Sequence, residues 1–234
     1  MSDVRVACAH FWEPTGMDKA QKRTSTQVSD SEGLQDWRVL LRSLQSSFAT
    51  GSMAKGIEFA ARVGAAADAA SHHPDLMITY PRVHVLLTTH ETDGLTNRDV
   101  DMARTISAIA TELGIAAEPT VATQLEIAID AMDIAAVKPF WEAVLGYKAH
   151  LDDDCLDPFG RGPAFWFQQM DAPRPQRNRI HIDVTVPHDI AQQRIAAALA
   201  AGGALVSDTA APAFWILADP EGNEACICTW QGRD

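Results

Sequence analysis

The sequence predicts an α+β protein built from two consecutive domains, and three observations lead to this prediction. At 234 residues the chain is long enough for two domains of ordinary size, each with its own core. Residues 34–114 combine short apolar strands with two amphipathic helices, and a different strand–helix–strand pattern starts at residue 124 and recurs from residue 180. Residues 115–123 break the periodicity and contain a proline, so we place the linker there.

The first domain is predicted to have the order strand, strand, helix, strand, strand, helix. The expected strands cover residues 37–41, 44–48, 76–80 and 83–89, and the expected helices cover 52–71 and 96–113. Pro74 cannot continue the first helix, so the chain must turn there. Thr96 and Asp99 form a capping box at the start of the second helix, which favours a structural role for Asp99. This order indicates a two-layer ββαββα unit with both helices on one face of an antiparallel sheet.

The second domain, residues 124–234, is predicted because the same order of strand and helix patterns occurs twice in it. Apolar residues alternate with polar ones at 125–129, and an amphipathic helix is expected over 134–145. The same order recurs with alternation at 180–186 and a helix at about 190–201. Residues 1–33 show neither the helical nor the strand spacing of apolar residues, so we expect an extension of uncertain order. Met17 could be the natural start.

Composition excludes some partners and compartments. Nineteen Lys and Arg against 31 Asp and Glu give a formal net charge of -12, which repels nucleic acid and anionic membrane surfaces. The sequence contains neither a membrane-spanning apolar run nor a signal-peptide layout, so we expect a cytoplasmic protein. The four cysteines lack CxxC spacing, which argues against a zinc ribbon or a disulfide framework. We expect Cys226 and Cys228 to be core thiols.

Three histidines are the leading candidates for chemistry. His72 and His73 end the first expected helix, and His90 ends the strand at 83–89, so three imidazoles are expected at one rim. Histidine moves protons near neutral pH because its unperturbed pKa is close to that pH. The structural alternative is that the His72–His73 pair complements the negative end of the helix dipole.

The spacing around these histidines resembles a family signature. It comprises Asp68, three residues, His72-His73-Pro74, five residues, Tyr80, nine residues, His90, eight residues and Asp99. Together with Trp37 and Thr88-Thr89-His90, this pattern resembles the pterin-4a-carbinolamine dehydratases over about residues 34–114. The resemblance implies their fold, assembly into dimers or tetramers, and removal of water from a 4a-hydroxytetrahydropterin to give quinonoid dihydropterin.

By the same resemblance, His72 and His90 are the acid/base candidates and His73 binds the pterin or its hydroxyl. The general acid protonates the departing hydroxyl while a base takes a ring-nitrogen proton. The resemblance implies no cofactor. A core position is an equally good interpretation of Trp37. The expected substrate-binding residues are Trp37, Asp68, Pro74, Tyr80 and Thr89.

Segments 140–147, 178–183 and 219–224 resemble the glyoxalase-like branch of the vicinal-oxygen-chelate superfamily, over about residues 124–230. The resemblance implies paired βαβββ modules curled around a cavity, in some members with a metal. The expected cavity residues are Glu126, Gln168, His181, Glu224 and Cys226. Because glutamine and cysteine occupy two of the usual ligand places, we expect an organic ligand without a tightly bound metal.

Two alternative functions stay open at this point. The protein could be a non-catalytic binder that uses the second cavity, or a metal-dependent lyase or dioxygenase centred on Glu126 and His181. The segment 171–177 is expected to be a loop over the cavity mouth, and its arginines are either ligand contacts or solvated charges. Trp166, Phe214 and Trp215 either line an apolar pocket or pack in the core.

Overall fold

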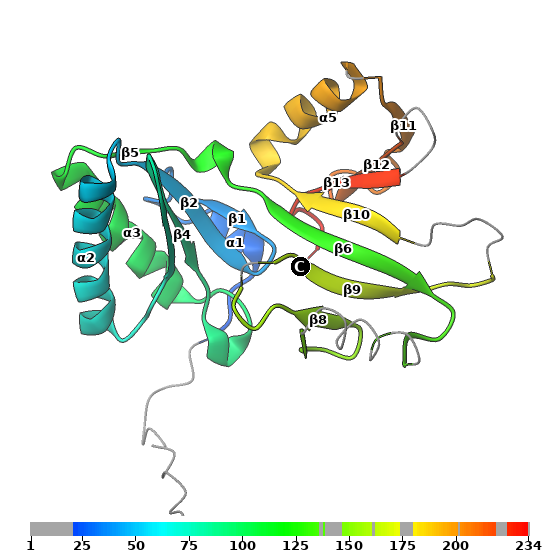
Figure 1. Ribbon diagram of the computed structural model, residues 1–234, viewed down its shortest axis with the longest axis horizontal. Helices are drawn as coiled ribbons and strands as arrows, with labels where there is room; N and C mark the ends of the chain where they lie inside the picture. The colour runs from blue at the N-terminus through cyan, green and yellow to red at the C-terminus, as the bar shows by residue number, and fades with distance from the viewer. Residues whose placement is uncertain are drawn as a thin grey trace, which may run out of the picture.

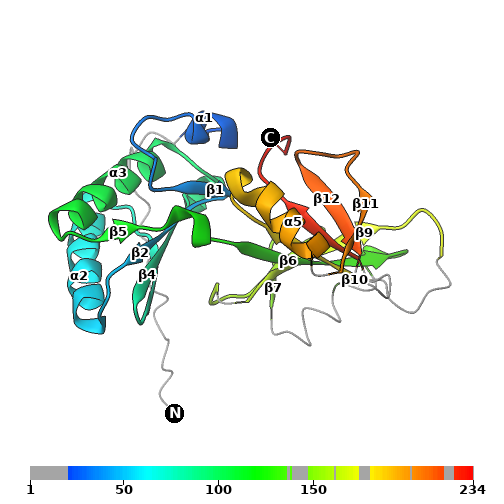
Figure 2. The ribbon, with the colours of Figure 1, turned by 90° about the horizontal axis from the view of Figure 1, so that it is seen from above.

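The computed structural model describes residues 21–135, 138, 147–160, 162–173, 180–200, 202–218 and 224–233. It contains two sheets, one from each half of the chain, and the C-terminal end of the chain lies between them (Figure 1; Figure 2). Across these described residues, the helices are all too short or too polar to cross a membrane.

The first sheet has the strand order β1-β2-β4-β3, with β5 paired to β2, and all its pairings are antiparallel. Its strands are β1 (Arg38–Leu40), β2 (Ser43–Ala49), β3 (Asp75–Thr79), β4 (Arg82–Leu87) and β5 (Ala116–Ala117). The helices α2 (Met53–Ala70) and α3 (Asn97–Glu112) pack together on one face of this sheet (Figure 1). The predicted two-layer ββαββα arrangement is confirmed.

Local chemistry explains where these helices begin and end. Ser52 caps α2 by accepting a hydrogen bond from the Lys55 N–H, and Ser71 ends it in the left-handed conformation at φ 48°. The capping box predicted at Thr96 and Asp99 starts α3. The helices bury their apolar faces against the sheet in a core that includes Phe48, Phe59, Val63, Val85 and Ile106.

The core of the first domain extends beyond the predicted boundaries at residues 34 and 114. Thr24 and Gln27 form a capping box that starts α1 (Ser25–Ser29), and Val28 is fully buried, so part of the predicted irregular extension is helical. In the predicted linker, β5 pairs with β2, and η2 (Pro119–Val121) packs along the same strand. Trp230 also belongs to this core, although it lies near the end of the chain.

The second sheet has the order β11-β12-β13-β10-β6-β9-β8-β7. Its strands are β6 (Gln124–Ala131), β7 (Lys148–Ala149), β8 (Asp154–Leu156), β9 (Ala164–Gln169), β10 (Ile180–Thr185), β11 (Ala204–Ser207), β12 (Phe214–Ala218) and β13 (Glu224–Cys228). The strands β6 and β10 are antiparallel at the centre, while β9 runs parallel to β6 and β13 parallel to β10. This symmetry confirms the predicted pair of modules.

The structure describes the helix of the second module but only a few residues of the helix expected in the first. The second module has η3 (His188–Ile190) and α5 (Ala191–Ala200), and α5 covers one face of the sheet (Figure 2). Most of the helix predicted at 134–145 lies outside the described residues, as do much of the predicted loop at 171–177 and most of segment 219–224. The covered face is apolar and includes Trp215, Leu217 and Ile227. The opposite face carries polar side chains, among them Glu126 and Asp183, and lines a cavity together with residues of the first domain.

Polar contacts join the two domains. The Arg38 guanidinium of β1 donates hydrogen bonds to both oxygens of the Asp189 carboxylate, at 2.8–3.2 Å. Gln45 of β2 donates to Gln124 of β6 at 3.0 Å. Arg42 contacts Asp93 at 2.7 Å within the first domain and Asp154 of the second domain at 3.8 Å.

Candidate functional site

The first candidate site is built around a buried His72–Asp99 pair. The left-handed Ser71 reverses the chain after α2, and the His72 N–H bonds to the Ala67 carbonyl at 3.1 Å. The His72 side chain is 6% exposed, and its Nε2 lies 2.8 Å from Oδ1 of Asp99, which is fully buried in the first turn of α3. The two helices therefore bring together residues 27 positions apart.

The Asp99 carboxylate accepts hydrogen bonds at both oxygens. Its Oδ2 receives the Thr96 N–H at 2.7 Å and the Thr89 hydroxyl at 2.7 Å, while Oδ1 faces His72. Since an ionised carboxylate only accepts, we assign the His72 ring proton to Nε2, which leaves the lone pair of Nδ1 as the acceptor of the ring. Asp99 therefore caps α3, as the sequence predicts, and also fixes the His72 ring. The sequence pattern did not indicate this second role.

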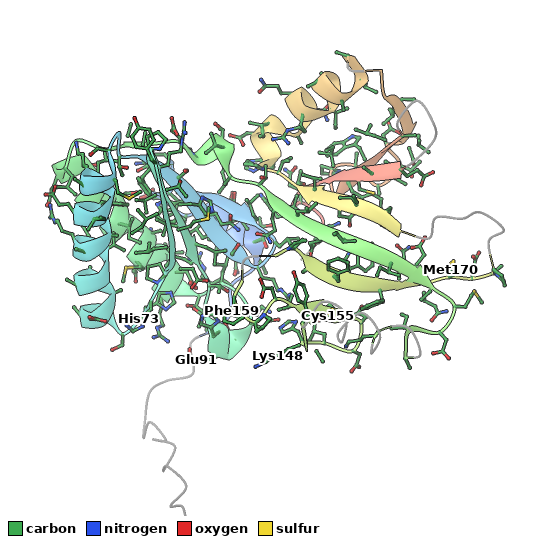
Figure 3. The ribbon with its side chains drawn as sticks, viewed as in Figure 1. His73, Glu91, Lys148, Cys155, Phe159 and Met170 are labelled. Atoms are coloured by element: carbon green, nitrogen blue, oxygen red, sulfur yellow. The ribbon has the colours of Figure 1, made fainter. Side chains whose placement is uncertain are left out.

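His73 and His90 are exposed at the same end of the sheet. His73 Nε2 lies 3.1 Å from the Asp68 carboxylate, and both side chains are mostly solvent-accessible. His90 follows β4 and begins the short helix η1 (His90–Thr92). Arg98 hydrogen-bonds the Ser71 carbonyl and the Glu91 carboxylate, so it ties the two histidine-bearing segments together. Figure 3 shows His73 and Glu91 at this end of the first domain.

Two other expected residues lie elsewhere. Tyr80 is 73% exposed in the turn between β3 and β4, at the opposite end of β3 from His72. Five residues of strand separate the two ends by about 16 Å, so the expectation that Tyr80 converges with the histidines is wrong. Trp37 is 2% exposed in the first core and donates from Nε1 to the Ser107 hydroxyl at 3.0 Å, a core position. Pro74 is half-buried beside the histidines.

The second candidate site lies on the polar face of the second sheet. Glu126 of β6 is paired in register with Asp183 of β10, so their side chains share this face. Burial raises the pKa of Glu126, and the nearby Arg233 partly offsets that effect. Asp183 is 3% exposed, and the structure describes no hydrogen-bond partner for its Oδ1.

The remaining expected cavity residues fall into two groups. Gln168 and Glu224 are exposed, whereas Cys226 is buried in register with Asp183. Donor atoms of His181, Asp183 and Cys226 lie within 4.8 Å of one another. Nitrogen, oxygen and sulfur donors of this kind suit zinc, so these three residues would hold a divalent ion if the domain takes one. The acidic neighbours of His181 are Asp183 at 3.6 Å and Asp130 at 3.7 Å, whereas the metal-dependent alternative paired it with Glu126.

A cavity of about 620 Å³ lies between the two domains. The second sheet contributes Glu126, Trp166 and Asp183 to its lining, and the first domain contributes Leu41 and Leu95. The sequence predicted a cavity within the second domain alone. Trp166 lines it, as one of the two interpretations of that residue predicted, while Trp215 packs in the core on the opposite face.

The two halves of the chain match two different families of known proteins. Residues 19–109 match the family model described as pterin 4 alpha carbinolamine dehydratase. A protein of Thermomicrobium roseum named "Putative pterin-4-alpha-carbinolamine dehydratase" is 48% identical over 24% of this chain and 60% of its own length. A protein of Trichodesmium erythraeum with the same name is 36% identical over 33% of this chain and 83% of its own length.

The chain belongs to the pterin-4a-carbinolamine dehydratase family. The dehydratase homology covers the first domain, and residues 126–228 match a glyoxalase-like domain. Among solved structures, a Brucella melitensis protein titled transcriptional coactivator/pterin dehydratase is 29% identical, covering 38% of this chain and 99% of its own, with a TM-score of 0.37.

Two residues of the candidate sites were not predicted from the sequence. The motif spacing includes Asp99, but its capping-box position led us to assign it a structural role only. Asp183 lies two residues after His181 in β10, a spacing that places both side chains on one face. The unpartnered oxygen of Asp183 depends on strand register and on the neighbouring domain, which local sequence does not specify.

Proposed function

We propose that the first domain removes water from 4a-hydroxytetrahydropterin to give quinonoid dihydropterin, with His72 and His90 as the acid/base pair and His73 as a substrate binder. The observation that carries this proposal is the fixed His72 ring at the sheet end where His73 and His90 are exposed. Family membership supports the reaction class.

The hydrogen bonds suggest how the roles divide. Asp99 holds the Nε2 proton of His72, so a proton exchanged with substrate passes through Nδ1. The exposed His90 is accessible from solvent and can meet the substrate from the other segment. One imidazole protonates the departing hydroxyl as the carbon–oxygen bond breaks and water leaves. The other takes a ring-nitrogen proton, so the overall reaction needs no oxidant or reductant.

The test is the rate of dehydration by the full-length protein, with the uncatalysed rate subtracted. General acid–base catalysis contributes about a hundred- to ten-thousand-fold, so His72→Ala and His90→Ala should each lower kcat by at least about tenfold. His73→Ala should act mainly by raising KM, because its proposed role is binding.

His84→Ala is the matched control. His84 lies in the same sheet and bonds to Gln45 at 3.2 Å, but it is outside the motif. This variant should retain at least half of the wild-type rate. If circular dichroism shows that His72→Ala and His90→Ala are folded and both react as fast as wild type, the catalytic assignment is wrong.

A further inference from the structure

We propose that the cavity between the two domains is a second binding site, which takes a planar nitrogen heterocycle carrying an amino group, held at its N–H edge by Asp183 and Glu126. Four features support this proposal: an unpartnered buried oxygen, a second carboxyl beside it, indole side chains in the lining, and closure by the dehydratase domain. The proposal does not depend on dehydratase activity.

Asp183 is the primary evidence. Its side chain lines the cavity and is 3% exposed, and Oδ1 has no N–H or O–H donor among the described residues; the neighbouring Cys226 thiol, whose pKa is raised by burial and by Asp183, is only a weak donor. The nearest basic atom is Nε2 of His181 at 3.6 Å, which is too long for a hydrogen bond. A buried carboxylate oxygen without a donor is costly, so a ligand that supplies an N–H group there gains an interaction that the protein leaves unmade.

Glu126 supplies a second carboxyl group at the site. It lines the same cavity and lies directly opposite Asp183 across the central β6–β10 pair. Side chains at such paired positions have Cβ atoms about 5 Å apart. Two neighbouring carboxyls suit a ligand edge with adjacent N–H donors, because two parallel hydrogen bonds are more specific than one, and they are strengthened when the carboxyls are ionised. Arg233, which also lines the cavity, favours the ionised form of Glu126.

Aromatic side chains favour a flat ligand. Trp166 of β9 and Trp230 of the C-terminal segment both line the cavity. Trp166 is held in an edge contact with His181 at a centroid distance of 6.0 Å, and Trp230 donates from Nε1 to His188 at 3.2 Å. Indole faces stabilise planar rings by stacking. The volume of about 620 Å³ falls within the range of roughly 300–1,000 Å³ typical of small-molecule sites.

The dehydratase domain closes the site on the other side. Leu41 and Leu95 line the cavity, and the Arg23 N–H bonds to the Leu95 carbonyl at 2.7 Å, which holds the N-terminal segment along the rim. The ligand would therefore contact both domains. A metal ion is a poorer occupant of this space, because His181 and Cys226, the partners of Asp183 in the possible ligand set, do not line it.

The test is calorimetric titration of the full-length protein with pterin (2-amino-4-oxopteridine) and with lumazine, which has a carbonyl in place of the 2-amino group. Pterin should bind the wild type at least about tenfold more tightly than lumazine, because lumazine leaves a carboxylate facing an oxygen. Asp183→Asn should weaken pterin binding by at least about tenfold. Asp208→Asn, the same change at an exposed position outside the cavity, should leave the affinity unchanged.

The His72→Ala variant separates this site from the first one, because it should retain the Asp183-dependent binding whether or not the first domain dehydrates pterins. Equal binding of pterin and lumazine to the wild type would overturn the proposal without using any variant. So would an unchanged pterin affinity in Asp183→Asn. Finding about one equivalent of divalent metal in the wild type that is absent from Asp183→Asn would overturn it in favour of an ion site.

Discussion

Asp99 and Asp183 are both buried carboxylates beside a histidine, but their surroundings differ. Asp99 receives hydrogen bonds from His72, Thr89 and Thr96, and every one of these donors belongs to the first domain. Asp183 has an unpartnered oxygen that faces a cavity shared by both domains. A buried carboxylate that is satisfied positions its neighbours, whereas one that is unsatisfied indicates space for a ligand.

The sharpest test of this comparison is the matched pair Asp99→Ala and Asp183→Ala. Asp99→Ala leaves the donors of His72, Thr89 and Thr96 without an acceptor and removes a helix cap, so we expect a loss of about 3–5 kcal/mol in the free energy of unfolding. Asp183→Ala removes a buried carboxyl group that has an unpartnered oxygen. The free energy of unfolding should therefore change by less than about 1 kcal/mol.

Urea denaturation at pH 7 measures both changes. Equal losses for the two variants would mean that Asp183 is satisfied within the folded protein, and the contrast between the two carboxylates would then disappear.

A second prediction concerns Trp230, which lines the cavity and also belongs to the first core. The side chain is 8% exposed, so Trp230→Ala should lower the unfolding free energy by about 3 kcal/mol. Trp230→Phe keeps most of the apolar surface and should lose only about 1 kcal/mol. Urea denaturation monitored by circular dichroism should show the loss in unfolding free energy. No loss in Trp230→Ala would mean that the first domain is independent of the C-terminal segment.

This contact also changes how the dehydratase domain should be assayed. A fragment limited to residues 34–118 lacks both Val28 and Trp230, which are buried in its core. The full chain is therefore the appropriate protein for kinetics.

Sequence patterns predicted the elements well, because their causes are local. The Thr96–Asp99 capping box, the end of α2 ahead of Pro74 and the alternation along β4 each depend on residues that are close in the sequence. The repeat in the second half was visible for the same reason, since strand alternation is a property of the strand itself.

The misses all involve contacts between distant parts of the chain. Tyr80 matches the motif spacing, but the β3–β4 hairpin places it at the far end from His72. Trp230 joins a core that is mainly formed by residues 28–115, and Asp183 faces a cavity completed by the first domain. None of these placements follows from periodicity, because each requires the relative position of two elements or two domains.

The smallest predicted effect concerns the Arg38–Asp189 ion pair between the two domains. Hydrogen bonding to the Arg38 guanidinium lowers the pKa of Asp189, so the pair stabilises the fold above the pKa of unfolded Asp, about 3.9. This stabilisation is lost as the pH falls through the lower folded-state pKa. The Asp189 side chain is 38% exposed, so solvent screening limits the pair to about 1 kcal/mol.

We therefore expect Asp189→Asn to lower the unfolding free energy by about 1 kcal/mol, equally at pH 7 and pH 5. The difference from wild type should shrink below about pH 4, where the unfolded state begins to bind the proton, and should be lost once the pH falls below the lower folded-state pKa. Asp101→Asn removes an exposed i,i+3 pair with Arg104 inside α3 and is the control, with an expected effect of at most about 0.5 kcal/mol. A difference for Asp189→Asn that stays constant down to pH 2 would show that the charge of Asp189 contributes nothing to the stability of the fold.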